Sequence, residues 1–280
     1  MKPIVIASHR RAGTHFVADA IRANWAPGGR RPEIVPLESV FRSPLDTDGT
    51  AAATRREIER RRREGRPMIL KTHCPAGFPE FWAPEYRSFV EGLLGAALIV
   101  RVTRSPLDVL RSLRRYVCGL EGQQPGGSLS EFAMAPSRFY PDCPALRGQS
   151  NAWVLGAHVG GWAQAMAGRP NCAAVSFEAL SLDYARALSA LFGDLGLALP
   201  RRWRDVRGLP GRWRRPWTRW LWPADFAPSA VNFGGGLVGR GRAEVGSVFH
   251  EGVILQAYAD GMIGTAAENL PMPQTIAIGA

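Results

Sequence analysis

Four short apolar runs, each ending abruptly in polar residues, set the strongest limit on the fold of this chain. They are almost continuously apolar and rich in β-branched residues, which is typical of parallel strands covered on both faces. Segments with helical spacing separate them. The alternation predicts an α/β fold, with a doubly wound parallel sheet flanked by helices, in a single domain over residues 1–280. The predicted strands are "PIVIAS" (3–8), "PMILKT" (67–72), "ALIVRVT" (97–103) and "CAAVSF" (172–177).

The predicted helices begin shortly after these runs or lie between them. In a sheet of this kind, ligands bind beyond the carboxyl ends of the strands, so the residues between strand and helix are the first candidates for a site. The predicted helices are 14–25, 51–65, 105–117 and 181–196.

The charge balance indicates what the protein binds. The formal net charge is +11 and the pI is about 10.5, which predicts attraction to nucleotide phosphates, acidic polymers, nucleic acid or an anionic membrane. The four cysteines show no C-x-x-C pair and no zinc spacing, so we expect free thiols, no metal and a reducing, cytoplasmic location. No run reaches the length of a membrane span.

The first strand leads into "ASHRRAGTHF", where Gly13 and Thr14 open a helix. The free amides and the dipole of a helix N-terminus attract phosphate. Arg11 adds a cation two residues earlier, although the loop lacks the lysine and glycine spacing of a Walker A motif. The segment indicates a phosphate cradle, and the alternative is an ordinary β–α turn with Thr14 as the N-cap.

A second strand ends in "KTHCP". Of the 35 Lys and Arg residues in the chain only two are lysines, Lys2 and Lys71. Lys71 and His73 are two residues apart in extended chain, so both side chains project to one side. A cation and a titratable imidazole at this position indicate a catalytic pair. The alternative is a hydrogen-bonded histidine without a catalytic role.

A third strand ends in "RVTRSPLDVLRS" (101–112), where Ser105 and Asp108 have the spacing of a helix capping box. Capping does not explain Arg104 at the strand tip, nor Ser112 about two helical turns later. A guanidinium and a hydroxyl at these positions suit a second phosphate.

Together these motifs resemble sulfotransferases that use 3′-phosphoadenosine-5′-phosphosulfate (PAPS), of the cytosolic and bacterial type with a P-loop-like fold. The similarity spans residues 3–196 in order. The phosphosulfate loop Tyr-Pro-Lys-Ser-Gly-Thr-Thr-Trp matches "HRRAGTHF" (9–16), and the motif Lys-Thr-His-Leu-Pro matches "KTHCP" (71–75). The 3′-phosphate motif matches "RSPLDVLRS" (104–112). His-Val-x-x-Trp matches "HVGGW" (158–162), and a Tyr-Glu-Asp strand end matches "SFEAL" (176–180).

Two departures from the family pattern are visible. The C-terminal motif Arg-Lys-Gly-x-x-Gly-x-Trp corresponds to "GRGRAEVGSVF" (239–249), which has Ala243 at the first glycine and no tryptophan. Arg11 stands where the family has lysine. Arginine clamps a phosphosulfate bidentately but is a poor proton donor.

The resemblance implies transfer of a sulfuryl group from PAPS to a hydroxyl of a small-molecule, glycan or lipid acceptor, with 3′-phosphoadenosine-5′-phosphate (PAP) as the second product. It implies that His73 is the general base, and that Lys71 and Arg11 stabilise charge on the bridging oxygen. The residues that it assigns to the nucleotide are Arg11, Ala12, Gly13, Thr14, His15, Arg104, Ser112, Phe177, Arg240 and Arg242.

Several alternatives remain open at this point. The chain is also compatible with a catalytically silent nucleotide-binding relative, or with a P-loop-type kinase that uses ATP. The segment 201–222 holds eight arginines and five tryptophans. It is expected to pack on the core, to cover an acceptor, or to contact an anionic membrane surface, with nucleic acid a weaker candidate. The oligomeric state is open. The expected acceptor-side loops are 36–50, 76–92, 119–150 and 201–236.

Overall fold

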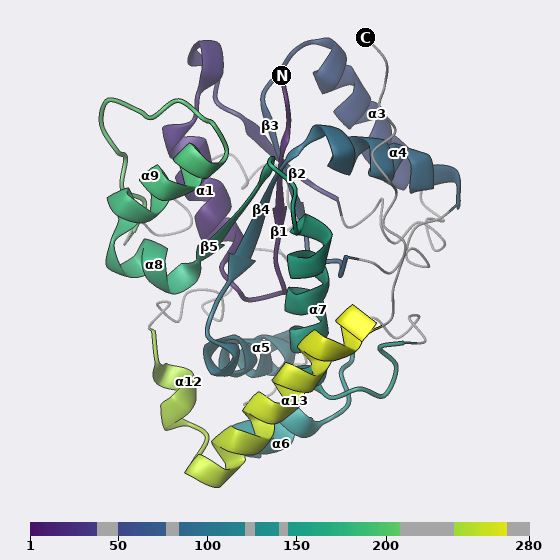
Figure 1. The fold of residues 1–280 in the computed structure, drawn as a ribbon, viewed down its shortest axis with the longest axis vertical. Coiled ribbons are helices and arrows are strands. Elements are labelled where there is room, and N and C mark those ends of the chain that lie inside the picture. The colour runs from purple at the N-terminus through teal and green to yellow at the C-terminus, as the bar shows by residue number, and fades with distance from the viewer. Residues whose placement is uncertain (38–49, 77–83, 121–126, 140–144, 208–237, 268–280) are drawn as a thin grey trace.

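The computed structural model describes residues 1–37, 50–76, 84–120, 127–139, 145–207 and 238–267 (Figure 1). Its centre is one parallel sheet with the strand order β2-β3-β1-β4-β5. All neighbouring strands run parallel, which confirms the predicted sheet. The strands are β1 (Ile4–Ala7), β2 (Glu33–Pro36), β3 (Met68–Thr72), β4 (Leu98–Thr103) and β5 (Cys172–Ser176).

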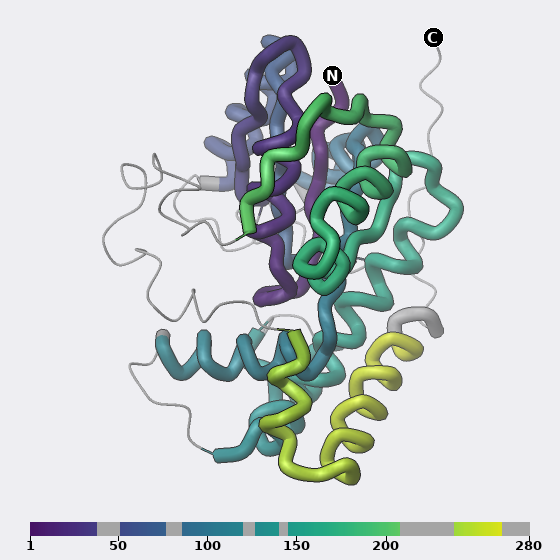
Figure 2. The backbone as a smooth tube through the Cα atoms, turned by 90° about the vertical axis from the view of Figure 1, so that its left-hand side faces the viewer, coloured from purple at the N-terminus to yellow at the C-terminus, as the bar shows by residue number. Residues whose placement is uncertain are grey.

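Helices cover both faces of the sheet, and further helices lie beyond the carboxyl ends of its strands (Figures 1 and 2). The first face carries α1 (Thr14–Asn24), α8 (Phe177–Leu182) and α9 (Tyr184–Asp194). The second carries α3 (Thr50–Arg63), α4 (Pro84–Ala96) and α7 (Asn151–Met166). The end layer consists of α5 (Pro106–Leu120), α6 (Leu129–Met134), α12 (Arg240–Ala243) and α13 (Val248–Ala267).

Strand β1 shows why the sheet needs cover on both sides. Its residues Ile4 and Ile6 belong to the core under α1 and α9, whereas Val5 and Ala7 belong to the core under α3, α4 and α7. All four are fully buried. Burial of a large aliphatic side chain contributes about 1.5–3 kcal/mol, so the strand anchors both layers.

The structure adds a strand and a helix that sequence reasoning missed. Strand β2 has only four residues, ends in Pro36 and is incompletely buried, so it lacks the long apolar run of its neighbours. Residues 84–96 form helix α4, and the expectation of a loop over 76–92 is therefore wrong from Pro84 onward.

Two further predictions are corrected. The single helix expected over 181–196 is two helices, because Asp183 accepts a hydrogen bond from the backbone N–H of Arg186 and caps α9. The expected loop 119–150 contains α6, which begins with a complete capping box formed by Ser128 and Glu131. The expected loop 36–50 falls mostly outside the described residues.

Helices α7 and α13 cross at two glycines. A Cβ atom at Gly156 would overlap with the carbonyl oxygen of Tyr258, and one at Gly261 would overlap with the carbonyl oxygen of Trp153. The absence of side chains therefore lets the two backbones touch. This crossing joins the second face of the sheet to the end layer.

Alanine substitution at Gly261 is expected to destabilise the protein by about 1–3 kcal/mol, because the added methyl group overpacks the crossing. Gly252 lies in the same helix with nothing within 4 Å of its Cβ position. Gly252→Ala should instead be neutral or stabilise the helix by up to about 1 kcal/mol. Thermal unfolding of both variants measures the difference, and equal melting temperatures would contradict the close crossing.

Candidate active site

The loop between β1 and α1 has an unusual backbone. Arg11 has φ of 69° and Gly13 has φ of 105°, so both occupy the left-handed region, which is uncommon for a residue other than glycine. The hydroxyls of Ser8 and Thr14 are hydrogen-bonded across the loop. Gly13, not Thr14, is the N-cap of α1. The N–H of Ala12 donates to the carbonyl of His9 at 3.2 Å, so this one of the predicted phosphate-binding amides already has a partner.

Phe177 packs directly beneath this loop. A Cβ atom at Gly13 would stand 2.6 Å from the Phe177 ring, so glycine is required there for space as well as for its φ angle. The guanidinium of Arg104 lies over the ring, 4.3 Å from its centroid. One face of the buried Phe177 is therefore covered by Arg104. The contact with the nucleotide that the resemblance implies for Phe177 stays a prediction.

Side chains from three elements meet at Arg11. Its Nε donates to Ser112 Oγ at 3.1 Å, and its guanidinium lies 5.2 Å from the centre of the Tyr116 ring. The guanidinium of Arg104 donates to the Arg11 carbonyl at 3.2 Å. The structure thus brings together Arg11, Arg104 and Ser112. His15, in the first turn of α1, has an exposed side chain.

The electrostatics of this group favour an anion. Burial lowers the pKa of Arg11, and the nearby charge of Arg104 lowers it further. Burial likewise lowers the pKa of Arg104, whose Nε has no hydrogen-bond partner among the described residues. Arginine nevertheless stays protonated in proteins. Two partly desolvated cations side by side are stabilised by an anionic ligand.

His73 follows β3 and is fixed by the same loop. Its Nδ1 donates to the Ser8 carbonyl at 2.9 Å. A carbonyl can only accept, so the proton is on Nδ1 and the lone pair is on Nε2. Burial, then the charges of Lys71 and Arg10, hold the pKa of His73 well below its usual value. The imidazole is neutral at neutral pH, which a general base requires.

Lys71 lies one residue before the end of β3. It pairs in register with Ile6 of β1 and Pro36 of β2, and it is 8% exposed. Its position in the central strands explains why the lysine lies beside His73 rather than in solvent. The structure places the predicted pair together.

Two further histidines complete this region. The rings of His9 and His158 meet edge to face, with centroids 5.5 Å apart. His9 Nδ1 donates to the Arg10 carbonyl at 2.9 Å, and burial lowers the pKa of His9 to about 4. The pKa of His158 is also well below its usual value, first through burial and then through His9 and His73. Sequence reasoning matched both residues to motifs but gave them no role, because their proximity depends on how α7 packs against the loop.

Asp108 has a different task from the one predicted. Its Oδ2 accepts from the N–H of Gly239 at 2.7 Å, and its Oδ1 accepts from the N–H of Gly241 at 2.6 Å. The N–H of Ser105, which a capping box would direct to Asp108, instead donates to Glu178 at 2.8 Å. The predicted capping box is therefore replaced by a bond between helix α5 and the C-terminal segment.

The C-terminal segment 238–247 follows α5 closely. A Cβ atom at Gly241 would overlap with the backbone of Leu107, and Glu244 forms an ion pair with Arg111. Arg242 is exposed and pairs with Glu251 at 2.9 Å. Arg240 shows no such partner among the described residues. Both candidate arginines are thus carried to the end of α5 that bears Arg104.

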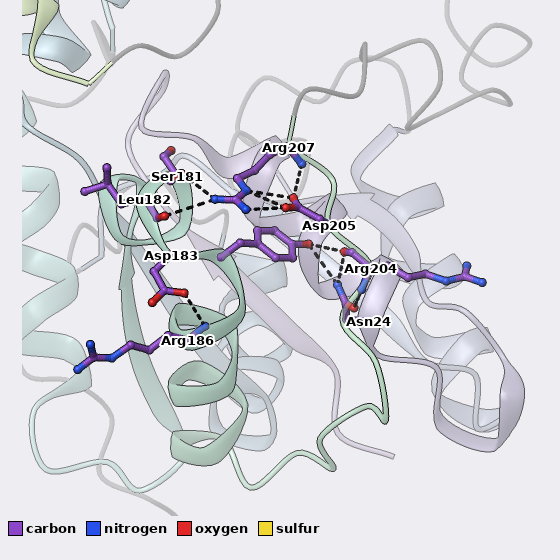
Figure 3. A network of polar contacts seen from close by, with 9 residues as sticks. Asn24, Ser181, Leu182, Asp183, Arg186, Arg204, Asp205 and Arg207 are labelled. Carbon is purple, nitrogen blue, oxygen red and sulfur yellow. Dashed lines mark hydrogen bonds and ion pairs between the residues drawn. The ribbon is translucent and has the colours of Figure 1, made fainter.

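The first residues of the arginine–tryptophan cluster dock on the core (Figure 3). Asn24 at the end of α1 accepts from the N–H of Arg204 at 2.7 Å, and the hydroxyl of Tyr184 donates to the Arg204 carbonyl at 2.9 Å. Trp203 packs edge to face on Phe192, with centroids 5.3 Å apart. This agrees with core packing for Trp203, whereas 208–222 lie outside the described residues.

The described residues contain neither a candidate metal site nor a membrane-spanning helix. No group of three or more His, Cys, Asp or Glu side chains in this part of the chain could hold a metal ion. None of its helices is both long enough and apolar enough to cross a membrane.

Asp108→Asn is expected to loosen the C-terminal segment, because the amide offers one acceptor where the carboxylate offers two. Hydrogen exchange at Gly239 and Gly241 should accelerate roughly tenfold or more, since a hydrogen bond to a charged group contributes about 1.5–3 kcal/mol. Asp194→Asn, at an exposed position on α9, is the control. Unchanged exchange in the Asp108 variant would show that Gly241 packing alone holds the segment.

Comparison with known proteins gives a fold but no close relative. No protein-family model matches the chain. A search of curated proteins also finds no match. Among solved structures, mouse sulfotransferase SULT7A1 complexed with PAP matches with a TM-score of 0.58 and 14% identity, over 93% of this chain and 84% of that one. Retinol dehydratase in complex with androsterone and the inactive cofactor PAP matches with a TM-score of 0.50 and 15% identity, over 94% and 81%. The protein has the α/β fold of these two proteins, the first of which is a sulfotransferase.

Proposed function

We propose that the protein is a sulfotransferase that moves a sulfuryl group from PAPS to a hydroxyl of an acceptor. The observation that carries the proposal is the hydrogen bond from His73 Nδ1 to the Ser8 carbonyl. It fixes the tautomer of the ring, which burial keeps neutral, so that the lone pair is on Nε2 beside a loop whose helix N-terminus and arginines suit an anion. The shared fold supports the same conclusion.

The donor would bind by its two phosphate groups. The amides at the start of α1, residues 13–15, suit the 5′-phosphate together with Arg11. Arg104 and Ser112 suit the 3′-phosphate. Of the two C-terminal arginines, Arg240 is the better candidate, because Arg242 already pairs with Glu251. The matched structures contain PAP, which supports this choice of nucleotide.

The chemistry then needs one proton transfer and one charge to be stabilised. As the acceptor oxygen bonds to sulfur, its proton passes to Nε2 of His73. The bond from sulfur to the bridging oxygen breaks, and its electrons remain on the 5′-phosphate. Lys71 and Arg11 stabilise that charge, and positioning does most of the remaining work, as in phosphoryl transfer.

A small-molecule hydroxyl is the acceptor class that the comparisons favour, since one matched structure contains androsterone beside PAP. The reducing cytoplasm is the expected location. An ATP-dependent kinase is disfavoured, because the loop after β1 lacks the Walker A lysine. A silent nucleotide-binding relative is separated from an enzyme by turnover with a labelled sulfate donor.

Replacing His73 by alanine should lower kcat by about 10²–10⁴-fold, because the general base is lost. Calorimetry with PAP should give an unchanged Kd, and ATP should bind more weakly than PAP. His250→Ala, at an exposed histidine of α13, is the control.

The lowered pKa of His73 adds a pH signature. Wild-type kcat should not fall near pH 6.5 and should be lost only in more acidic solution, where Nε2 takes up a proton. Normal turnover of the alanine variant would remove His73 from the mechanism.

Lys71→Arg keeps the charge but should lose most activity. A compact ammonium on a flexible stem can approach one bridging oxygen, whereas the planar guanidinium needs more room at a buried position. The chain uses arginine nearly everywhere else, so a requirement for charge alone does not explain Lys71. Sulfate-transfer rates at saturating PAPS measure the effect. A fully active arginine variant would mean that the lysine is incidental.

A further inference from the structure

A second set of basic side chains lies on the other side of the loop from Arg11. Arg11 turns toward Ser112 and Tyr116 of α5. Arg10 instead places its guanidinium over the Phe139 ring, 5.3 Å from the centroid. The two neighbouring arginines thus serve different regions. The charge of Arg10 also lowers the pKa of His73, so its guanidinium lies within electrostatic range of the proposed general base.

Arg10 has no acidic partner in the described part of the chain. Its buried Nε makes no hydrogen bond there. Two other shielded arginines do pair with carboxylates, Arg61 with Glu33 at 2.6 Å and Arg111 with Glu244. A buried donor without a partner costs free energy, most of all when it carries charge. The position is therefore suited to a ligand group that accepts a hydrogen bond from Arg10.

His158 repeats this pattern with a neutral group. Its buried Nε2 has no hydrogen-bond partner among the described residues. Trp162 holds this part of α7 in place by donating to the Cys74 carbonyl at 2.9 Å. A buried ring nitrogen and a guanidinium Nε, neither with a hydrogen-bond partner among the described residues, thus lie within electrostatic range of His73.

We propose that Arg10 binds an anionic group of the acceptor, a carboxylate or a sulfate ester carried near the hydroxyl that is sulfated. This inference rests on the proposed function. The donor phosphates would be held by Arg11 and Arg104 on the α5 side, so Arg10 remains for the second substrate. The Phe139 ring lies against the guanidinium, and a guanidinium can bind a planar or tetrahedral anion bidentately. The acceptor is then an acidic molecule rather than a neutral lipophilic one.

The test uses matched pairs of an acid and its methyl ester, so that only the charge differs. Suitable pairs are hydroxyphenylacetate, a hydroxy fatty acid and glucuronic acid with their esters. Calorimetry measures their binding to the full chain saturated with PAP, and again without nucleotide. At least one acid should bind roughly tenfold more tightly than its ester, as one charged hydrogen bond predicts. Arg10→Met should erase that preference and leave the PAP affinity unchanged.

The matched control is Arg186→Met, which removes an exposed arginine on α9 that points away from the core (Figure 3). It should keep the preference for the acid. Equal binding of acids and esters to the wild type overturns the proposal. So does a preference that survives in Arg10→Met, or an equal loss for acid and ester in that variant, since Arg10 would then act on the donor. Failure of PAP to bind instead counts against the proposed function, and the titrations without nucleotide still decide the role of Arg10.

Discussion

The candidate site depends on how Ser8 joins the ends of two adjacent strands. Its N–H donates to the Thr72 carbonyl at 3.2 Å, and its own carbonyl accepts from the ring of His73 at 2.9 Å. These bonds extend the β1–β3 pairing by one step beyond the sheet. They also fix the tautomer of the imidazole. The loop after β1 and the histidine after β3 therefore form one rigid unit, and rigidity of this kind is what a positioned base requires.

The charges and the burial of this unit also set the protonation state of His73. Lys71 and Arg10 lie close to His73, and burial withdraws Lys71 and His73 from water. The positive charges of Lys71 and Arg10 thus help to keep the imidazole neutral. In the proposed reaction, Lys71 would face the donor and Arg10 the acceptor, so one arrangement of charge would serve both the substrates and the base. In the free protein these positive charges repel one another, and the binding of an anion reduces that repulsion.

Helix α5 connects this unit to the far end of the chain. Its side chains contact the loop after β1 through Ser112 and the C-terminal segment through Asp108. Gly241 lets that segment lie on the backbone of α5. Where the sulfotransferase motif has a glycine and a tryptophan, this segment has Ala243 and no tryptophan. Even so, Arg240 is held at the same end of the helix as Arg104.

The sequence by itself determined what depends on neighbours along the chain. Four of the five strands are recognisable, because each is a continuous apolar run. The polar residues that end these runs must lie at one edge of a parallel sheet, so the motifs around Gly13, His73 and Arg104 could be found. Only the tertiary structure decided what depends on contacts between distant segments. It moved Asp108 from a local cap to a bond across 131 positions and split the helix expected over 181–196. It also gathered His9, Arg10 and His158 beside His73. A buried hydrogen bond or an unpaired charge is a property of the whole packed fold, and no local pattern records it.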